Sequence, residues 1–359
     1  MPTPDSGVPA ARLNSLTSLR FFAAAVVVLV HLSAELDLPH LIDEAVGLGY
    51  AGVAFFFTLS GFVLAWTARP GDTARRFYGR RFARIWPAHA VVTVLTIPVI
   101  YLAGAEPVWG ALTFVLTCTH VWIPSPAWHY AFNGPSWSLA AEAFFYAVFP
   151  VLIRVARRWQ ERLRVLAAFT VTLMVVAALA VVAVAPDTTW GFLLYLNPLY
   201  RLGEFGLGIL LACAIRRGWR APWPTWIPAA GGVGAYLALV LFAPHDSEGE
   251  IPRILTDSVL LPFFLAVIAA AASADLRGDR TPLRAPSLVA LGDRSFALYL
   301  IHVPLIKAVD AGVAGRDLGD AARSALAVGL LAGSVCAAHL LFVAVERPAE
   351  RYLRPRLAS

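Results

Sequence analysis

About ten long apolar stretches follow one another along this chain of 359 residues, and most of them are long enough to cross a bilayer as a helix. The chain is 59% hydrophobic and 14% charged, whereas soluble domains carry about 25% charged residues. Backbone polar groups inside a bilayer must be satisfied within the segment, so apolar runs of this length form α-helices. The sequence therefore predicts an all-α, multi-pass protein of the cytoplasmic (inner) membrane.

Short basic clusters between these stretches set the predicted orientation. The largest holds six arginines within residues 69–84, and the positive-inside rule places this cluster, and with it the amino terminus, in the cytoplasm. About ten spans are then predicted, with both termini cytoplasmic: residues 20–37, 50–68, 86–104, 136–153, 165–185, 191–215, 225–243, 254–273, 290–310 and 322–345. This gives a cytoplasmic segment at 1–19, a transmembrane domain at 20–345 and a cytoplasmic tail at 346–359.

One apolar stretch conflicts with the charge pattern. Residues 108–123 are just long enough to span, but a crossing there would put the five arginines between residues 154 and 164 outside. We therefore expect residues 105–135, which contain no Lys or Arg, to form an extracytoplasmic re-entrant or interfacial segment.

Charge and cysteine content exclude several classes of function. The net charge of +6 does not indicate nucleic-acid binding, because the basic residues are confined to short clusters between apolar runs. The three cysteines are far apart in the chain, so neither a metal site nor a disulfide framework is predicted. No bound cofactor is expected.

The first span carries two ionisable residues, Arg20 and His31. Eleven helical residues make just over three turns, so these side chains share one face about 16 Å apart. Arg20 would lie at the cytoplasmic surface and His31 near the middle of the bilayer. Ionisable groups at that depth are costly and are usually functional.

A polar stripe marks the fourth span, where Ser138, Glu142 and Tyr146 recur every four residues. Glu142 reaches about the same depth as His31, from the opposite side. A carboxylate beside an imidazole raises its basicity and selects its tautomer, as a general base requires.

Three further intramembrane groups leave two interpretations open. Arg201 and Glu204, three residues apart in the sixth span, form either an internal ion pair or contacts to a polar substrate. His302 in the ninth span is either a structural histidine or a substrate contact.

The cytoplasmic arginines Arg80, Arg81 and Arg84 either mark topology alone or bind phosphate.

Seven blocks in order resemble the membrane acyltransferase 3 family, over residues from about 14 to 352: LRFFAAAVVVLVH, GVAFFFTLSGFVL, RRFARIWPAH, NGPSWSLAAEAFFYAVFP, RLGEFGLGILLA, SFALYLIHVPLI and VERPAERYL. The resemblance implies a ten-helix enzyme that moves acyl groups, commonly acetyl, from coenzyme A thioesters to carbohydrate hydroxyls. Acyl-CoA, with acetyl-CoA as the first candidate, would be the co-substrate. The acceptor would be a carbohydrate, a glycolipid or a glycosylated natural product.

The resemblance also implies roles for particular residues. His31 matches the catalytic histidine, Arg20 its companion and Glu142 the acidic position. The family usually has a second acidic residue after that position, where this chain has Ala143. Arg80, Arg81 and Arg84 match the basic motif and would bind the CoA phosphates. The residues expected to contact substrate are Ser138, Tyr146, Arg201, Glu204 and His302.

Two mechanisms and one other function remain open. His31 either deprotonates the acceptor hydroxyl for direct attack or carries the acyl group itself. We favour direct attack, because no second activated nucleophile is evident. A transporter or exporter of a small polar or acylated metabolite would also explain the spans and the intramembrane charge, but the two halves of the chain show no convincing repeat.

Overall fold

The computed structural model describes residues 12–69, 71–185, 189, 191–243, 252–316 and 318–357, and all regular elements in them are helices. In this part of the chain, nine helices are long and apolar enough to cross a membrane. The prediction of an all-α, multi-pass membrane protein is therefore confirmed, while the orientation of the termini stays a prediction. Residues 1–11 of the predicted N-terminal segment and residues 358–359 of the predicted tail lie outside the described residues.

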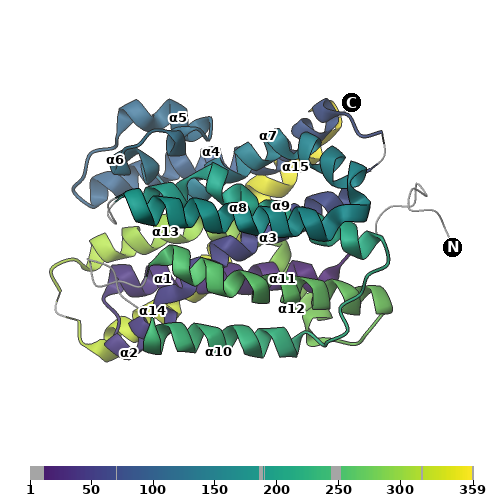
Figure 1. Cartoon of the computed structure of the whole chain (residues 1–359). Helices are drawn as coiled ribbons and strands as arrows, with labels where there is room; N and C mark the ends of the chain where they lie inside the picture. The colour runs from purple at the N-terminus through teal and green to yellow at the C-terminus, as the bar shows by residue number, and fades with distance from the viewer. Residues whose placement is uncertain are drawn as a thin grey trace. The chain divides into compact units, whose positions relative to one another are not determined.

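The helices fall into two compact units, and α1 (Asn14–Leu36) and α7 (Ser136–Arg158) contribute several residues to each. The first unit contains α3 (Gly52–Thr67), η4 (Gln160–Arg162), α8 (Leu163–Val184), the π-helix η6 (Gly191–Leu196), α9 (Pro198–Arg216), α10 (Trp226–Phe242), α11 (Arg253–Arg277), η7 (Pro282–Arg284) and α12 (Pro286–Asp293). Within it, α8 lies beside α9 and α10 beside α11 (Figure 1).

The second unit takes the central part of the chain and its C-terminal end. It contains α2 (His40–Val46), η1 (Gly47–Ala51), α4 (Ala74–Leu102), η2 (Trp109–Ala111), α5 (Leu112–Leu116), η3 (His120–Trp122), α6 (Pro126–His129), α13 (Ser295–Val313), α14 (Asp320–Leu341), the π-helix η8 (Phe342–Glu346) and α15 (Arg347–Leu357). Here α13 packs against α14 and against α4.

One of the ten predicted spans is shorter than expected. The span predicted at 225–243 forms α10, which has 17 residues. At 1.5 Å per residue it is about 26 Å long, less than the roughly 30 Å of a bilayer core. This is why the described residues hold nine membrane-length helices rather than ten: α3 alone has only 16 residues, but it continues α2 and η1 in one helical stretch of 28 residues, His40–Thr67.

The first helix begins at Asn14, six residues before the predicted span. Its start is capped by a side chain far away in the sequence: the backbone N–H and the hydroxyl of Ser15 both donate to the Asp275 carboxylate, at 2.8 and 2.7 Å. A carboxylate at a helix N-terminus satisfies an orphan amide and complements the helix dipole. Arg20 is therefore already inside the helix.

Two glycines bring α3 and α9 into unusually close contact. A Cβ atom on Gly61 would lie 2.0 Å from the carbonyl oxygen of Phe205, and one on Gly208 would lie 2.0 Å from that of Thr58. No side chain fits at either position, so the two backbones approach directly. Small residues allow such packing between membrane helices, and here they set α9 against α3.

The segment at 105–135 forms no membrane-crossing helix, as predicted. Its described helices have at most five residues, whereas a span needs about 20. Ala111, Val115 and Phe132 form a small buried core with residues of α4. The rings of Trp86 and His89 on α4 also donate hydrogen bonds to the carbonyls of Leu116 and Val115, at 3.0 and 2.9 Å. Figure 1 shows α5 and α6 as short helices, α5 beside α4.

The described part of the predicted tail at 346–359 is helical. It continues from α14 through η8 into α15, which packs against α4. A Cβ atom on Gly79 would lie 2.4 Å from the carbonyl oxygen of Leu357, so the end of α15 touches the backbone of α4 next to Arg80. That the tail is cytoplasmic stays a prediction.

Candidate active site

His31 and His302 lie side by side in the second unit. The Nδ1 atom of His31 is 3.3 Å from the Nε2 atom of His302, and the ring centroids are 4.9 Å apart at an angle of 73°. His31 is half-buried and His302 is fully buried. The sequence predicted a role for each residue and gave no reason to expect their contact.

Backbone carbonyls determine which nitrogen of each ring carries the proton. The Nδ1 atom of His31 is 2.9 Å from the Val27 carbonyl oxygen, and the Nδ1 atom of His302 is 3.2 Å from that of Leu298. A carbonyl oxygen only accepts hydrogen bonds, so both rings carry the proton on Nδ1 when neutral. The Nε2 atom of each ring then holds a lone pair.

Hydrogen bonds from the turn before α7 and from the first turn of α7 hold α13 in place. Pro304 lies inside α13 and has no N–H, so the carbonyl of Leu300 loses its usual partner four residues on. The side-chain amide of Asn133 donates to that carbonyl instead, at 2.9 Å. Tyr299 adds a second link, because its hydroxyl lies 2.7 Å from the hydroxyl of Ser138 and donates to the Pro135 carbonyl at 3.2 Å.

The polar stripe predicted on the fourth span lies on one continuous helix, α7. Ser138 is buried in contact with Tyr299, Glu142 is half-buried and Tyr146 is buried. Burial, and then the charge of Glu142, raise the pKa of the Cys118 thiol to about 11, which places the carboxylate near the 105–135 segment. A pairing of Glu142 with His31 stays a prediction, as do substrate contacts by Ser138 and Tyr146.

The predicted phosphate-binding arginines lie on a helix and not in a loop. The Thr73 hydroxyl accepts a hydrogen bond from the Arg76 amide at 3.3 Å and so caps α4. Arg80, Arg81 and Arg84 follow seven to eleven residues into that helix and are all half-buried. The spacing places Arg80 and Arg84 one turn apart on the same face. Arg20 lies on α1 and is half-buried too.

In the first unit, Arg201 forms an ion pair with Glu204, which is one of the two interpretations that the sequence left open, and a second ion pair with Asp257, which was not among the predicted site residues. Its Nη1 atom is 2.8 Å from Glu204 Oε1 and 2.5 Å from Asp257 Oδ2. All three side chains are buried. Asp257 is an acidic residue in the predicted span at 254–273, and that position is the signal that could have identified it.

Aromatic rings surround this triad. The Arg201 guanidinium lies 5.3 Å from the ring centroid of Phe57 and 5.1 Å from that of Tyr195, and Arg253 lies 5.0 Å from the Tyr195 centroid. Such cation–π contacts stabilise a desolvated guanidinium. Within the described residues, the Nε and Nη2 atoms of Arg201 have no hydrogen-bond partner, although the side chain is fully buried.

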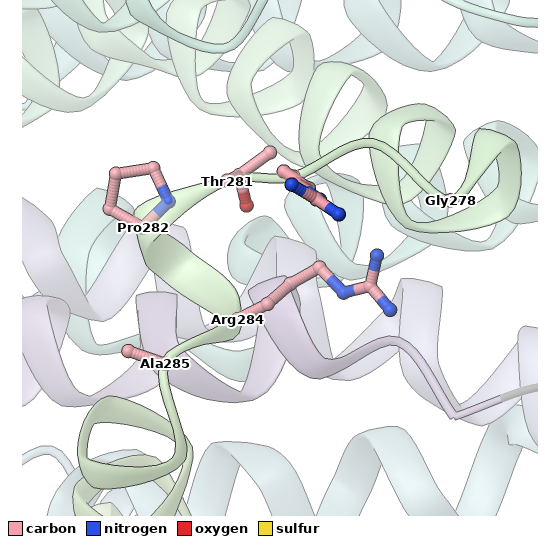
Figure 2. Close-up of a pocket in the computed structure, with 6 residues that line it drawn as sticks. Gly278, Thr281, Pro282, Arg284 and Ala285 are labelled. Carbon is pink, nitrogen blue, oxygen red and sulfur yellow. The ribbon is translucent and has the colours of Figure 1, made fainter.

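An open pocket in the connection from α11 to α12 contains none of the predicted site residues. It is lined by Gly278, Arg280, Thr281, Pro282, Arg284 and Ala285. Figure 2 shows the Arg284 side chain extending along the stretch between Thr281 and Gly278, and its Nη1 atom donates to the Asp279 carbonyl at 2.9 Å. No cluster of three or more His, Cys, Asp or Glu side chains in the described ranges is placed to hold a metal ion.

Comparison with known proteins indicates an enzyme. A family model described as an acyltransferase domain matches residues 13–343. The chain is 37% identical to the acyltransferase MdmB of Streptomyces mycarofaciens, over 96% of this chain and 93% of MdmB. It is 29% identical to the exopolysaccharide production protein ExoZ of Rhizobium meliloti, over 86% of this chain and 92% of ExoZ.

A third relative is longer than this chain. The chain is 24% identical to the peptidoglycan O-acetyltransferase OatA of Listeria monocytogenes, over 81% of this chain and 49% of OatA. No solved structure gives a significant match.

Proposed function

Because this chain belongs to the membrane acyltransferase 3 family, we propose that it transfers an acyl group from acyl-CoA to a hydroxyl of a carbohydrate or of a glycosylated acceptor. Acetyl-CoA is the first donor to test. Membership in an acyltransferase family favours this enzyme over the transporter that the spans alone also allow. The names of two relatives, a peptidoglycan O-acetyltransferase and an exopolysaccharide production protein, support a carbohydrate acceptor.

The tautomer of His31 is the observation that carries this proposal. Its Nδ1 atom carries the proton, because it faces the Val27 carbonyl at 2.9 Å. The lone pair is therefore on Nε2, where it can take the proton of an acceptor hydroxyl. A ring held in one tautomer within a membrane helix needs no rearrangement before that transfer.

The His31 imidazole carries out both proton transfers of the reaction. The Nε2 atom of His31 takes the hydroxyl proton, the acceptor oxygen attacks the thioester carbonyl, and the carbon–sulfur bond breaks to release CoA. The proton on the imidazolium then protonates the CoA thiolate. In the alternative route the acyl group is bound transiently to Nε2 before it reaches the acceptor. We favour direct attack.

The other predicted residues have separate roles in this scheme. Arg80, Arg81 and Arg84 bind the phosphates of CoA, because guanidinium groups form bidentate hydrogen bonds with phosphate oxygens. Arg20 assists at the cytoplasmic, donor side of α1, and Glu142 stabilises the positive charge on His31. Arg201 and Glu204 contact the polar substrate. This role is supported by the Nε and Nη2 atoms of Arg201, which have no hydrogen-bond partner in the described residues.

The test is acyl transfer by the purified protein in detergent. Release of CoA thiol from acetyl-CoA, with and without a sugar acceptor, is followed in the wild type and in His31→Ala and His31→Gln, and the acetylated product is identified by mass. We expect both variants to lose transfer while keeping the elution profile and melting temperature of the wild type. His40→Ala, which replaces an exposed histidine on α2, is the matched control. Transfer retained in His31→Ala would refute the role of His31.

A further inference from the structure

We propose that His302 is a positioning residue for His31: it accepts a hydrogen bond from the Nδ1–H group of His31 and stabilises the imidazolium that forms when His31 takes a proton. This inference rests on the proposed function of His31. It assigns His302 a partner within the protein, in place of the substrate contact expected from the sequence.

The tautomer of His302 makes it an acceptor toward His31. Its Nδ1–H group is directed to the Leu298 carbonyl at 3.2 Å, so the lone pair is on Nε2. That Nε2 atom lies 3.3 Å from the Nδ1 atom of His31. The proton on His31 therefore lies between two acceptors, the Val27 carbonyl oxygen and the His302 nitrogen.

Protonation of His31 strengthens this contact. In the neutral ring, Nδ1–H is a shared and weak donor at 3.3 Å. Once Nε2 takes a proton the ring is positively charged, and hydrogen bonds from a charged donor are about twice as strong as neutral ones. The interaction is therefore greater in the transition state than in the ground state, which is what accelerates a reaction.

The surroundings of His302 keep it rigid. Its ring is fully buried and lies 5.9 Å, centroid to centroid, from the ring of Tyr299. Tyr299 is bonded to Ser138 and Pro135, and Asn133 holds the neighbouring turn of α13 through the Leu300 carbonyl. The turn before α7 and the first turn of α7 thus hold His302 against His31, a role that accounts for the buried Ser138 hydroxyl.

Two substitutions separate positioning from simple packing. His302→Leu fills similar space without an acceptor, whereas His302→Gln keeps an acceptor oxygen. We expect His302→Leu to lower kcat by about 10- to 100-fold, the value of a lost hydrogen bond to a charged group, with KM for both substrates within about threefold. His302→Gln should recover most of that loss. His339→Gln, on an exposed histidine of α14, is the control.

A measurement that needs no activity accompanies the kinetics. The protein is labelled with 15N-histidine, reconstituted in lipid and studied by solid-state NMR. The signals that are absent from the spectrum of His302→Gln belong to the ring nitrogens of His302. We expect Nδ1 to be protonated and Nε2 unprotonated at neutral pH. A protonated Nε2 would overturn the inference even if transfer occurs, and so would unchanged kcat in a folded His302→Leu protein. An inactive wild type with the expected spectrum would refute the proposed function alone.

Discussion

The Nε2 atom of His302 lies 3.3 Å from the Nδ1 atom of His31, although 271 positions separate them in the chain. A second contact between the same helices, from Lys307 Nζ to Glu35 Oε1 at 3.5 Å, lies about one turn further along both. Because both residue numbers increase in the same direction, α1 and α13 run parallel there. The charge pattern predicts that the first and ninth spans both run outward from the cytoplasm. That prediction requires the two helices to be parallel.

Loss of the α4 arginines should weaken donor binding. We expect replacement of Arg80, Arg81 and Arg84 together by Gln to raise KM for acetyl-CoA at least about tenfold with a smaller effect on kcat, because bidentate contacts to phosphate are lost. Steady-state kinetics with varied acetyl-CoA would measure this. The matched control replaces the exposed arginines Arg154, Arg158 and Arg164 by Gln. Equal KM values in the two triple variants would leave the α4 cluster as a topology marker.

Breaking the buried triad should destabilise the protein strongly. Arg201→Met would leave Glu204 and Asp257 buried without the guanidinium that pairs with both, and breaking a buried ion pair typically costs about 3 to 5 kcal/mol. The same change at Arg217, whose ion pair with Glu161 is solvent-exposed on the glutamate side, should cost only about 0 to 1 kcal/mol. Thermal unfolding in one detergent compares the two variants. If both melt at the same temperature, the triad contributes no more than a surface pair.

The close contact of α3 with α9 predicts a position-specific effect of alanine. Gly61→Ala and Gly208→Ala each place a Cβ atom 2.0 Å from a backbone oxygen, and overpacking of this kind costs about 1 to 3 kcal/mol or more. Gly206→Ala, on the same helix as Gly208, meets no atom within 4 Å and should be neutral or slightly stabilising. Melting temperatures of the purified variants test the difference. If Gly206→Ala also destabilises the protein, alanine on α9 has an effect beyond helix propensity, and the loss of stability is not specific to the positions in close contact.

Stability should fall in mild acid because of His120. Burial, and then repulsion from His89, lower the pKa of His120 to about 4, whereas an unfolded histidine titrates near 6.5. The unfolded chain therefore binds a proton first as the pH falls, and this one group removes about 2 kcal/mol of stability between pH 7.5 and 5. The loss begins near pH 6.5 and is complete below pH 4.

The experiment compares melting temperatures at pH 7.5 and 5. His120→Gln should show a smaller drop than the wild type, because the variant has no proton to bind at that position. His40→Gln, at an exposed position on α2, is the control for loss of a histidine. An equal drop in the wild type and His120→Gln would assign the acid sensitivity to other groups.

Parts of the candidate site were predictable because they lie within one helix. The ion pair of Arg201 with Glu204 followed from their spacing of three residues. Asp257 joins the pair from α11, and no periodicity relates it to Arg201. The capping of α1 by Asp275 is of the same kind: the helix begins six residues before the predicted span, because a residue far away in the sequence satisfies its first turn.

The sequence by itself determined the class of the protein: long apolar runs with few charges must be helices in a bilayer, because no other backbone arrangement of such runs satisfies their polar groups there. It also singled out the ionisable residues that the bilayer makes costly. The tertiary structure decided their partners, because contacts between helices far apart in the sequence form only when the helices pack together. It set His302 against His31 and Asp257 against Arg201, and it directed the Asn133 amide to the carbonyl that Pro304 leaves unpaired.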